Sequence, residues 1–159
     1  MEELQHCEIL KTNINVTNMS DTIKYIAGHL DDLRGKYICV SNVHTTVMSY
    51  ENEEYRKIQN GAAMALPDGA PLSSYSRRKG YKQAQRVTGP DLMLELFAIS
   101  KEKGYRHYFY GATEETLQSM KEVLERDYPG IQIAGMYAPP FRVLTPQEDA
   151  QIVAKINEA

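Results

Sequence analysis

Two glycine-containing turns carry the residues of this sequence that are best suited to chemistry. One is Leu66-Pro67-Asp68-Gly69, and the other is Arg86-Val87-Thr88-Gly89-Pro90-Asp91-Leu92. Each turn places a carboxylate beside a glycine, where the backbone can bend sharply and a ligand can approach closely. Open α/β proteins bind their ligands at turns that follow strands, so the two turns predict an active site.

Asp68 is the first candidate catalytic residue. It follows an apolar run over residues 62–66 that is typical of a strand buried on both faces. The Pro-Asp-Gly order also suits an ordinary type I turn, in which the aspartate bonds the local backbone. The position of Asp68 just past the end of a buried strand strengthens the case for a catalytic role, and both interpretations stay open at this point.

The second turn has two interpretations as well. Thr88 and Asp91 have nearly the spacing of a capping box, and Asp91 would favour the dipole of the helix that starts there. The same helix start offers free N–H groups, and Arg86 adds a positive charge. Together these groups would suit a phosphate or the hydroxyls of a sugar.

Two further positions follow expected strands. Gly111-Ala112-Thr113 leads from a strand into a helix, which is a weak sign of nucleotide binding because the full G-x-G-x-x-G pattern is absent. A tight turn explains Gly111 equally well. Asn42 follows the apolar run 37–40 and would make a good helix cap, but its location also directs it toward the expected crevice.

The basic residues between the two acidic turns form a local cluster. They are Arg77, Arg78, Lys79, Lys82 and Arg86. Such a run is usually a solvated face, but this location also suits a diphosphate or an anionic lipid head group. No His, Cys or carboxylate residues have the spacing of metal ligands, so we expect no tightly bound catalytic metal.

The elements that must position these residues alternate between strand and helix. We expect strands within 8–16, 37–40, 62–66, 105–110 and 131–136. We expect helices over 18–33, 45–59 in two pieces, 70–79 and 89–103, and another that begins within 111–114 and ends near 128. Thr145 and Glu148 have the spacing of a capping box and predict the start of a last helix. This order predicts an α/β, Rossmann-like fold with a mainly parallel sheet flanked by helices, in a single domain over 1–159. The last helix reaches Ala159 with no following strand, which indicates a shortened chain.

Composition restricts the class of protein. The 159 residues include 42% hydrophobic and 25% charged residues, values that are typical of a globular domain with a real core. The net charge of −3 argues against a nucleic-acid partner. Two cysteines and a start without a signal-peptide pattern predict a reducing, cytoplasmic location. No apolar stretch has the length of a membrane span, so we expect any membrane contact to be peripheral.

Five segments taken together resemble the WecB/TagA/CpsF family of bacterial glycosyltransferases. They are Ser41-Asn42-Val43-His44, Leu66-Pro67-Asp68-Gly69, Arg86-Val87-Thr88-Gly89-Pro90-Asp91-Leu92, Tyr110-Gly111-Ala112 and Tyr128-Pro129-Gly130, and the match extends over roughly 8–159. The resemblance implies an inverting transfer of N-acetylmannosamine, or a related sugar, from a UDP-sugar. The acceptor would be a lipid-diphosphate-linked N-acetylglucosamine at the inner face of the cell membrane, in teichoic acid, capsule or related polysaccharide synthesis.

The same resemblance assigns roles to individual residues. Asp68 matches the family's proposed catalytic base, and the motif positions that line the cleft fall on Asn42, Arg86, Thr88, Asp91 and Gly111. Some relatives carry a threonine near the strand-end asparagine, where this chain has Val40 and Ser41. Inversion needs one base to accept the proton of the acceptor hydroxyl, and helix starts with Arg86 would offset the charge of the leaving diphosphate without a metal cofactor.

The resemblance also implies that something is missing. Family chains continue through a further strand and a basic C-terminal segment tied to membrane contact, so we expect that this fragment lacks both and is inactive alone. A nucleotide-sugar-binding module without turnover is the alternative, and an α/β domain that serves protein assembly is a third. The resemblance is compatible with a homo-oligomer and does not identify the exact sugar, acceptor or polymer.

Overall fold

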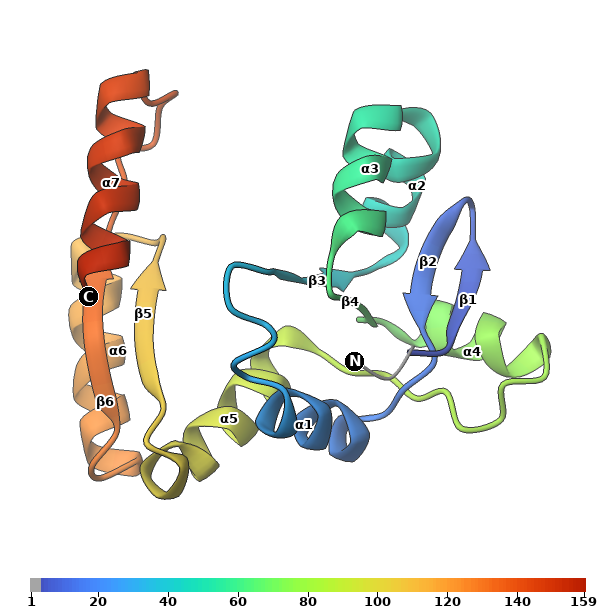
Figure 1. Cartoon of the computed structure of the whole chain (residues 1–159), viewed down its shortest axis with the longest axis horizontal. Coiled ribbons are helices and arrows are strands. Elements are labelled where there is room, and N and C mark those ends of the chain that lie inside the picture. The colour runs from blue at the N-terminus through green and yellow to red at the C-terminus, as the bar shows by residue number, and fades with distance from the viewer. Residues whose placement is uncertain (1–3) are drawn as a thin grey trace. The chain divides into compact units, whose positions relative to one another are not determined.

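The structure, a computed structural model, describes residues 4–159, and its helices and strands fall into two compact units. The first unit ends at Glu95, and the second extends from Leu96 to Ala159 (Figure 1). The helix α5 (Gly89–Lys103) contains the boundary between the units. That residues 1–159 act as a single domain stays a prediction.

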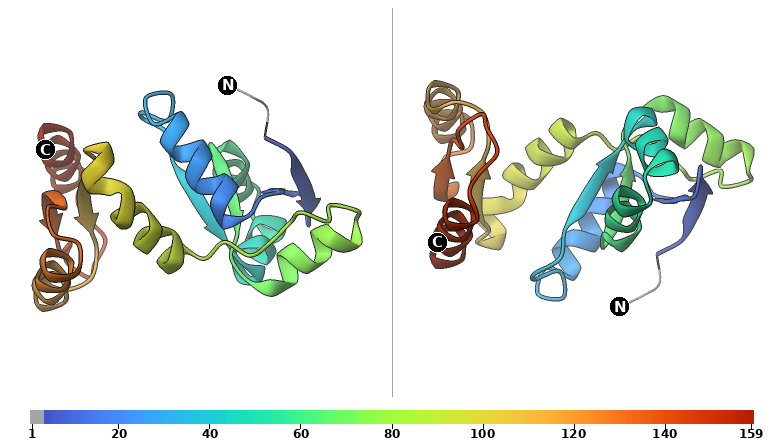
Figure 2. Two further views of the ribbon diagram at one scale, coloured as in Figure 1. Left: turned by 90° about the horizontal axis from the view of Figure 1, so that it is seen from below. Right: turned by 90° about the horizontal axis from the view of Figure 1, so that it is seen from above.

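The first unit combines an antiparallel hairpin with a pair of parallel strands. Its elements are β1 (His6–Ile9), β2 (Thr12–Asn15), α1 (Met19–Gly28), β3 (Ile38–Ser41), α2 (Val43–Glu51), α3 (Glu53–Gly61), β4 (Met64–Pro67) and α4 (Ala70–Arg78). The hairpin β1–β2 is labelled in Figure 1, and Figure 2 shows this blue N-terminal region from two further directions. Strands β3 and β4 run parallel, so Ser41 lies opposite Pro67 and both strands end at the same edge.

The core of the first unit explains why β4 is apolar at every position. All four residues of β4 are buried, and Leu66 is fully enclosed. One face of β4 meets the hairpin, where the side-chain oxygen of the buried Asn15 accepts a 2.6 Å hydrogen bond from the N–H of Ala65. Ala65 also belongs to a cluster with Ile9, Ile14 and Leu72, which joins the hairpin to α4. The prediction of a buried strand before Asp68 is therefore confirmed.

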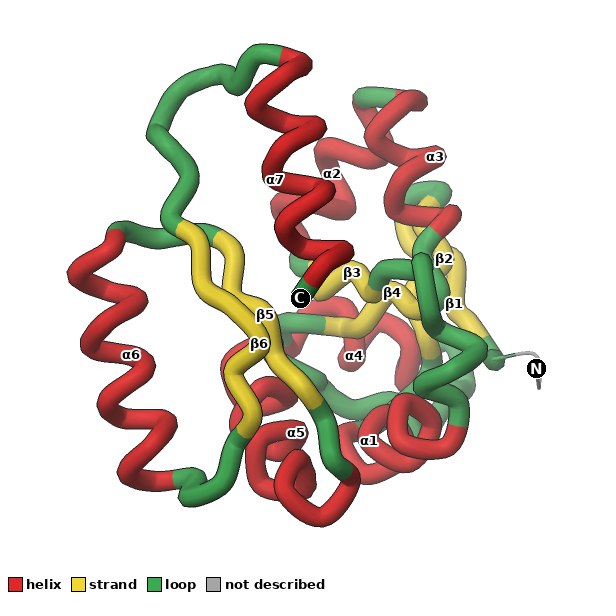
Figure 3. Tube along the Cα trace, turned by 60° about the vertical axis from the view of Figure 1, so that its left-hand side comes forward, coloured by secondary structure: helices red, strands yellow, loops and turns green. Residues whose placement is uncertain are grey.

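The second unit is built on another parallel pair. Its elements after α5 are β5 (Arg106–Tyr110), α6 (Glu114–Asp127), β6 (Gln132–Tyr137) and α7 (Pro146–Glu158). Helix α6 forms the crossover and packs against β6 (Figure 3). The register shifts between His107 and Tyr108, and there Gly135 faces the Tyr108 ring. A Cβ at position 135 would lie only 2.4 Å from a carbon of that ring, so this packing requires glycine.

Most expected elements are present, and the α/β class with parallel strand pairing is confirmed. The helix expected over 45–59 does form two pieces, because Asn52 ends α2 in an extended conformation and its side chain caps α3. The helix expected over 18–33 was predicted too long, since α1 ends at Gly28. Residues 30–35 form turns instead, with the N–H of Leu33 bonded to the carbonyl of His29. In the described residues, the strands form three two-stranded sheets rather than one continuous sheet.

Candidate functional site

Three polar segments meet at the C-terminal ends of β3 and β4. The N–H of Asp68 donates a 2.7 Å hydrogen bond to the carbonyl of Ser41, which joins the ends of the two strands. The N–H of Val87 donates to the carbonyl of Pro67 at 3.0 Å, which brings in the second turn. The structure therefore places Asn42, Asp68 and the Thr88–Asp91 turn at one edge of this parallel pair, as the sequence predicted.

Gly89 shows how closely the second turn approaches β3. A Cβ built on Gly89 would lie 3.6 Å from a methyl carbon of Val40, which is ordinary van der Waals contact. The start of α5 therefore contacts β3 at Val40, two residues before Asn42. Since all these residues belong to the first unit, their arrangement does not depend on where the second unit lies.

Asp68 is the one carboxylate of this edge that is both sheltered and unoccupied. Its residue is half-buried, and within residues 4–159 no hydrogen bond or ion pair reaches its carboxylate. The carboxylate of an aspartate that only stabilised a turn would accept a hydrogen bond from the local backbone, and the Asp68 carboxylate accepts none in the described residues. Gly69 follows at a φ of +115°, a conformation that favours glycine, and it starts α4 without a side-chain cap. The carboxylate is therefore free to accept a proton beside uncapped helix N–H groups.

Asn42, by contrast, is occupied by its structural role. Its side-chain oxygen accepts a hydrogen bond from the N–H of Thr45 at 3.1 Å, and its own N–H donates to the Thr45 hydroxyl at 2.9 Å. This reciprocal pair is a complete capping box at the start of α2. The capping interpretation of Asn42 is confirmed, and only its side-chain amide nitrogen remains to contact a ligand.

Thr88 and Asp91 are also engaged with each other. The Thr88 hydroxyl donates to the Asp91 carboxylate at 2.5 Å and accepts from the N–H of Asp91 at 3.2 Å. This confirms their predicted role as a cap at the start of α5. Arg86, two residues earlier, is exposed, and its guanidinium has no hydrogen-bond or ion-pair partner in the described residues. Arg86 therefore offers the unneutralised positive charge of this edge.

Gly111 belongs to the second unit and is described there. It follows β5 at a φ of +130°, and Ala112 also has a positive φ of 58°, so the chain turns sharply before Thr113 caps α6. The Gly111 N–H donates to the carbonyl of Tyr137 at 3.0 Å and is not free for a ligand. A position for Gly111 beside Asp68 stays a prediction.

One cavity of the first unit lies away from this edge. A cavity of about 390 Å³ in the first unit is lined by Asn15, Gln59 and Asn60, and it lies near Ala62 and Ala63, before β4 begins. The side-chain amides of Gln59 and Asn60 make hydrogen bonds to other elements of the first unit. The buried Ser41 hydroxyl donates to the side-chain oxygen of Gln59 at 2.7 Å, and the Asn60 side chain donates to the carbonyl of Lys11 at 3.0 Å.

A comparison with protein families decides what kind of protein this is. Residues 7–159 match the model of the glycosyl transferase WecG/TagA/CpsF family, which is nearly the whole chain. The chain belongs to this family. Three of the five segments that carried the resemblance lie in the first unit, at the β3–β4 edge, and the segments 110–112 and 128–130 lie in the second unit.

Curated relatives of this WecG/TagA/CpsF chain carry one name, N-acetylglucosaminyldiphosphoundecaprenol N-acetyl-beta-D-mannosaminyltransferase. A protein of Bacillus spizizenii is 32% identical over 107 residues, which is 67% of this chain and 42% of the relative. A protein of Bacillus subtilis is 26% identical over 120 residues, covering 75% of this chain and 47% of the relative. A Staphylococcus aureus protein is 22% identical over 129 residues, or 51% of its own length. The chain therefore spans about half the length of these relatives.

Two polar contacts of this family member were not anticipated from the sequence, one between Ser100 and His107 and one between Arg142 and Glu148. On α5, the buried Ser100 hydroxyl lies 2.6 Å from Nε2 of His107 on β5, and burial lowers the pKa of His107 below its ordinary value of 6.5. Phe97 and Phe109 pack against the His107 ring, so this pair belongs to a packing core. The spacing of Phe97 and Ser100 along one face of α5 was the available signal.

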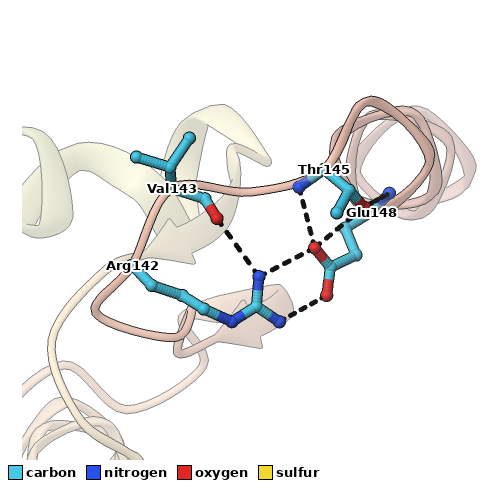
Figure 4. A network of polar contacts seen from close by, with 4 residues as sticks. All are labelled: Arg142, Val143, Thr145 and Glu148. Carbon is cyan, nitrogen blue, oxygen red and sulfur yellow. Dashed lines mark hydrogen bonds and ion pairs between the residues drawn. The ribbon is translucent and has the colours of Figure 1, made fainter.

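The second contact lies before α7. Thr145 and Glu148 form the predicted capping box, and Arg142 adds a two-point ion pair to the Glu148 carboxylate (Figure 4). These contacts lower the pKa of Glu148 to about 2, first through the hydrogen bond from Arg142 and then through the bonds from Thr145. The arrangement fixes the loop before α7, and its charges neutralise one another.

Among residues 4–159, no group of three or more His, Cys, Asp or Glu side chains is placed to hold a metal ion. In the same range, no helix combines the length and the apolar character needed to cross a lipid bilayer.

Proposed function

We propose that this chain is the part of a glycosyltransferase that carries the catalytic base. In this proposal, the enzyme moves N-acetylmannosamine, or a related sugar, from a UDP-sugar to a lipid-diphosphate-linked N-acetylglucosamine. The observation that carries the proposal is the half-buried, unpartnered carboxylate of Asp68 at the shared end of β3 and β4. Membership of the family and the names of the relatives support it.

Asp68 would act as the base of a single inverting displacement. Its carboxylate takes the proton from an acceptor hydroxyl as that oxygen forms a bond to the anomeric carbon of the donor sugar. The bond from that carbon to the UDP phosphate breaks on the opposite face, and UDP leaves with the electron pair. The half-buried position suits this role, because a partly sheltered carboxylate binds a hydroxyl proton with less competition from water.

The leaving diphosphate needs positive charge, and the site has two sources of it. Arg86 is exposed and has no acidic partner in the described residues. The first N–H groups of α4 have no side-chain cap, and helix starts of this kind attract anions. We propose that Arg86 contacts the diphosphate, while Asn42, Thr88 and Asp91 shape the edge on which the donor rests.

The proposed reaction takes place at the inner face of the cell membrane, where a UDP-sugar meets a lipid-linked acceptor. We further propose that the enzyme binds this surface peripherally. In this proposal, the contact is made by parts of the relatives' length that this chain does not span. Donor, acceptor and membrane contact all belong to the proposal, since the chain spans about half of each relative.

One observation favours a second candidate, a nucleotide-sugar-binding module without turnover. The side chains of Thr88 and Asp91 are engaged with each other, which leaves fewer groups to handle an acceptor. The two functions differ in one experiment, in which the chain is mixed with UDP-N-acetylmannosamine and a lipid-linked acceptor and the disaccharide product is measured. Thermal stabilisation by UDP with no product supports the binding module, and product formation supports the transferase.

A further inference from the structure

A narrow apolar groove lies between α2, α4 and the tip of the β1–β2 hairpin in the first unit. Its volume is about 170 Å³, and its lining includes Leu10, Val43, Thr46, Pro71, Leu72 and Tyr75. We call it the α2–α4 groove. Thr46 and Tyr75 carry the hydroxyl groups among these six residues, and the Thr46 hydroxyl is already used in a 2.6 Å hydrogen bond to the carbonyl of Asn42. The groove therefore offers carbon surface and almost no hydrogen bonding.

The groove adjoins the candidate site. Val43 directly follows Asn42, and Pro71 lies just past the turn that carries Asp68. The Cδ of Pro71 is 3.7 Å from the position of a Cβ on Gly69, and the N–H of Asp68 is bonded to the carbonyl of Ser41. A molecule whose reacting end lies at Asp68 could therefore continue directly into the α2–α4 groove.

The rim of the groove is exposed apolar surface. Leu10 and Val43 are each 47% exposed, and Tyr75 is 39% exposed. Leu10 and the next residue, Lys11, turn the hairpin with φ angles of 48° and 65°. Asparagine and glycine normally occupy such left-handed positions, and a leucine there is strained. Strain of this kind collects at functional positions, and here it holds an exposed leucine at the rim.

Positive charge borders the apolar rim. The ammonium group of Lys79 lies 5.5 Å from the centre of the Tyr75 ring. A shallow hollow that shares Pro71 and Tyr75 with the groove is also bordered by Arg78. An apolar channel with cations beside it suits an amphiphile that has an anionic head and a hydrocarbon chain.

We propose that the α2–α4 groove receives the first isoprenoid units of the acceptor's polyprenyl chain. The inference rests on the proposed function, because it assumes that a lipid diphosphate presents its sugar to Asp68. A groove this narrow holds a short stretch of branched hydrocarbon and is too small for a peptide helix. The name of the relatives supplies the chemistry, since it includes an N-acetylglucosaminyldiphosphoundecaprenol acceptor.

Two acceptor analogues with the same N-acetylglucosamine-diphosphate head distinguish the contribution of the groove to binding from that of the rest of the site. One carries a farnesyl-length chain, and the other carries an ethyl group. We expect the farnesyl analogue to bind this chain at least about tenfold more tightly, because burying several methylene groups in an apolar groove stabilises the complex. Calorimetry or fluorescence anisotropy of the two analogues gives the ratio.

A pair of matched substitutions tests the location. Val43→Thr places a hydroxyl in the groove without changing the size of the side chain. It should reduce the affinity for the farnesyl analogue about fivefold. Val47→Thr is the control, because Val47 is a similarly exposed valine one turn further along α2 and is not among the residues that line the groove. Neither variant should change the affinity for the ethyl analogue or for UDP.

Leu10→Asn separates binding from folding. Asparagine tolerates the left-handed conformation, so the variant should be at least as stable to heat as the wild type. It removes the leucine from the rim, so the farnesyl analogue should bind several-fold more weakly. A stable variant with weakened tail binding cannot be explained by unfolding.

A photoreactive group on the first isoprenoid unit provides a readout that needs no turnover. We expect it to label peptides that contain Leu10, Val43 or Tyr75. Equal affinities for the farnesyl and ethyl analogues would overturn the inference, and so would labelling confined to other segments. Loss of binding to vesicles without acceptor in Val43→Thr would identify a general lipid surface instead and would also overturn it.

The failure of this inference is distinguishable from failure of the proposed function. If the ethyl analogue is glycosylated but the chain length has no effect, the transferase proposal survives and the groove proposal does not. If no acceptor is glycosylated and UDP does not bind, the proposed function itself fails.

Discussion

The backbone N–H of Asp68 donates a 2.7 Å hydrogen bond to the carbonyl of Ser41, so the turn that carries the free carboxylate is tied to the end of the neighbouring strand. Ser41 is itself fully buried, and its hydroxyl is bonded to Gln59 on α3. The position of Asp68 is therefore set by two strands and a helix rather than by the turn alone. A group held in this way can be changed chemically with little movement of the backbone.

Asp68→Asn should abolish most of the transfer activity and leave binding of the donor nearly unchanged. Asparagine keeps the shape and the turn but cannot accept a proton, so the rate should fall by a factor on the order of 10²–10⁴. The measurement is the rate of product formation in the complete enzyme, together with UDP-sugar affinity. Asp91→Asn is the control, because the Asp91 carboxylate is engaged with Thr88 and should matter less to the rate. Near-normal turnover in Asp68→Asn would remove Asp68 from the mechanism.

Arg86→Gln should weaken UDP binding by about tenfold or more, because a charge-assisted contact to the diphosphate is lost. Folding should be unaffected, since the Arg86 side chain is exposed and has no partner in the described residues. Arg34→Gln is the control, because Arg34 is also an exposed arginine of the first unit. Its Nη2 lies 3.7 Å from Oδ1 of Asp31, so its charge already has an acidic partner. Titration of UDP by calorimetry compares the two variants. Similar affinities in both would show that Arg86 does not contact the diphosphate.

UDP binding should not depend on a divalent cation. The expectation rests on the residues of the β3–β4 edge, where Arg86 and uncapped helix N–H groups face the proposed diphosphate. The test is a titration with UDP in the presence of a chelator and again with added magnesium or manganese. A large loss of affinity in the chelator would contradict the expectation.

Stability should fall as the pH drops through the range in which His107 gains a proton. Burial lowers the pKa of His107 in the folded chain below its ordinary value of 6.5, so the unfolded chain binds the proton first. The contribution of neutral His107 is therefore fully present above about pH 6.5 and decreases as the pH falls toward the folded pKa. Denaturant midpoints between pH 5 and pH 8 measure this slope.

His107→Phe should reduce that pH dependence, because phenylalanine fits beside Phe97 and Phe109 but does not titrate. His44→Gln is the control, since His44 is an exposed residue near the start of α2. An unchanged slope in His107→Phe would assign the pH dependence to another group.

Local sequence signals determined most of the elements. The buried strand β4 (Met64–Pro67) was recognisable from the apolar run 62–66, because neighbouring apolar side chains need cover on both faces. The cap of Thr145 and Glu148 at α7 was recognisable from spacing alone, since both partners lie within one helical turn. The acidic turns were identified for the same reason, because Pro, Asp and Gly act on their immediate neighbours.

Other features depended on residues that are distant in the sequence. The end of α1 at Gly28 was missed, since the apolar pattern continued to Leu33 while the chain turned away. The strained Leu10–Lys11 turn has no glycine or asparagine to reveal it. Propensity describes a residue's own backbone, and these outcomes depend on what packs against it.

The candidate site shows the same division. The sequence by itself determined which residues stand at strand ends, because Asp68, Asn42 and Thr88 each follow or begin a recognisable element. The caps made by Asn42 and by Thr88 with Asp91 join residues three positions apart, and the spacing had indicated them. Only the tertiary structure decided that the side chains of Asp68 and Arg86 have no partner among the described residues. The α2–α4 groove likewise joins Leu10, Val43 and Tyr75. Availability for chemistry depends on contacts across the fold, and spacing along the chain cannot specify those contacts.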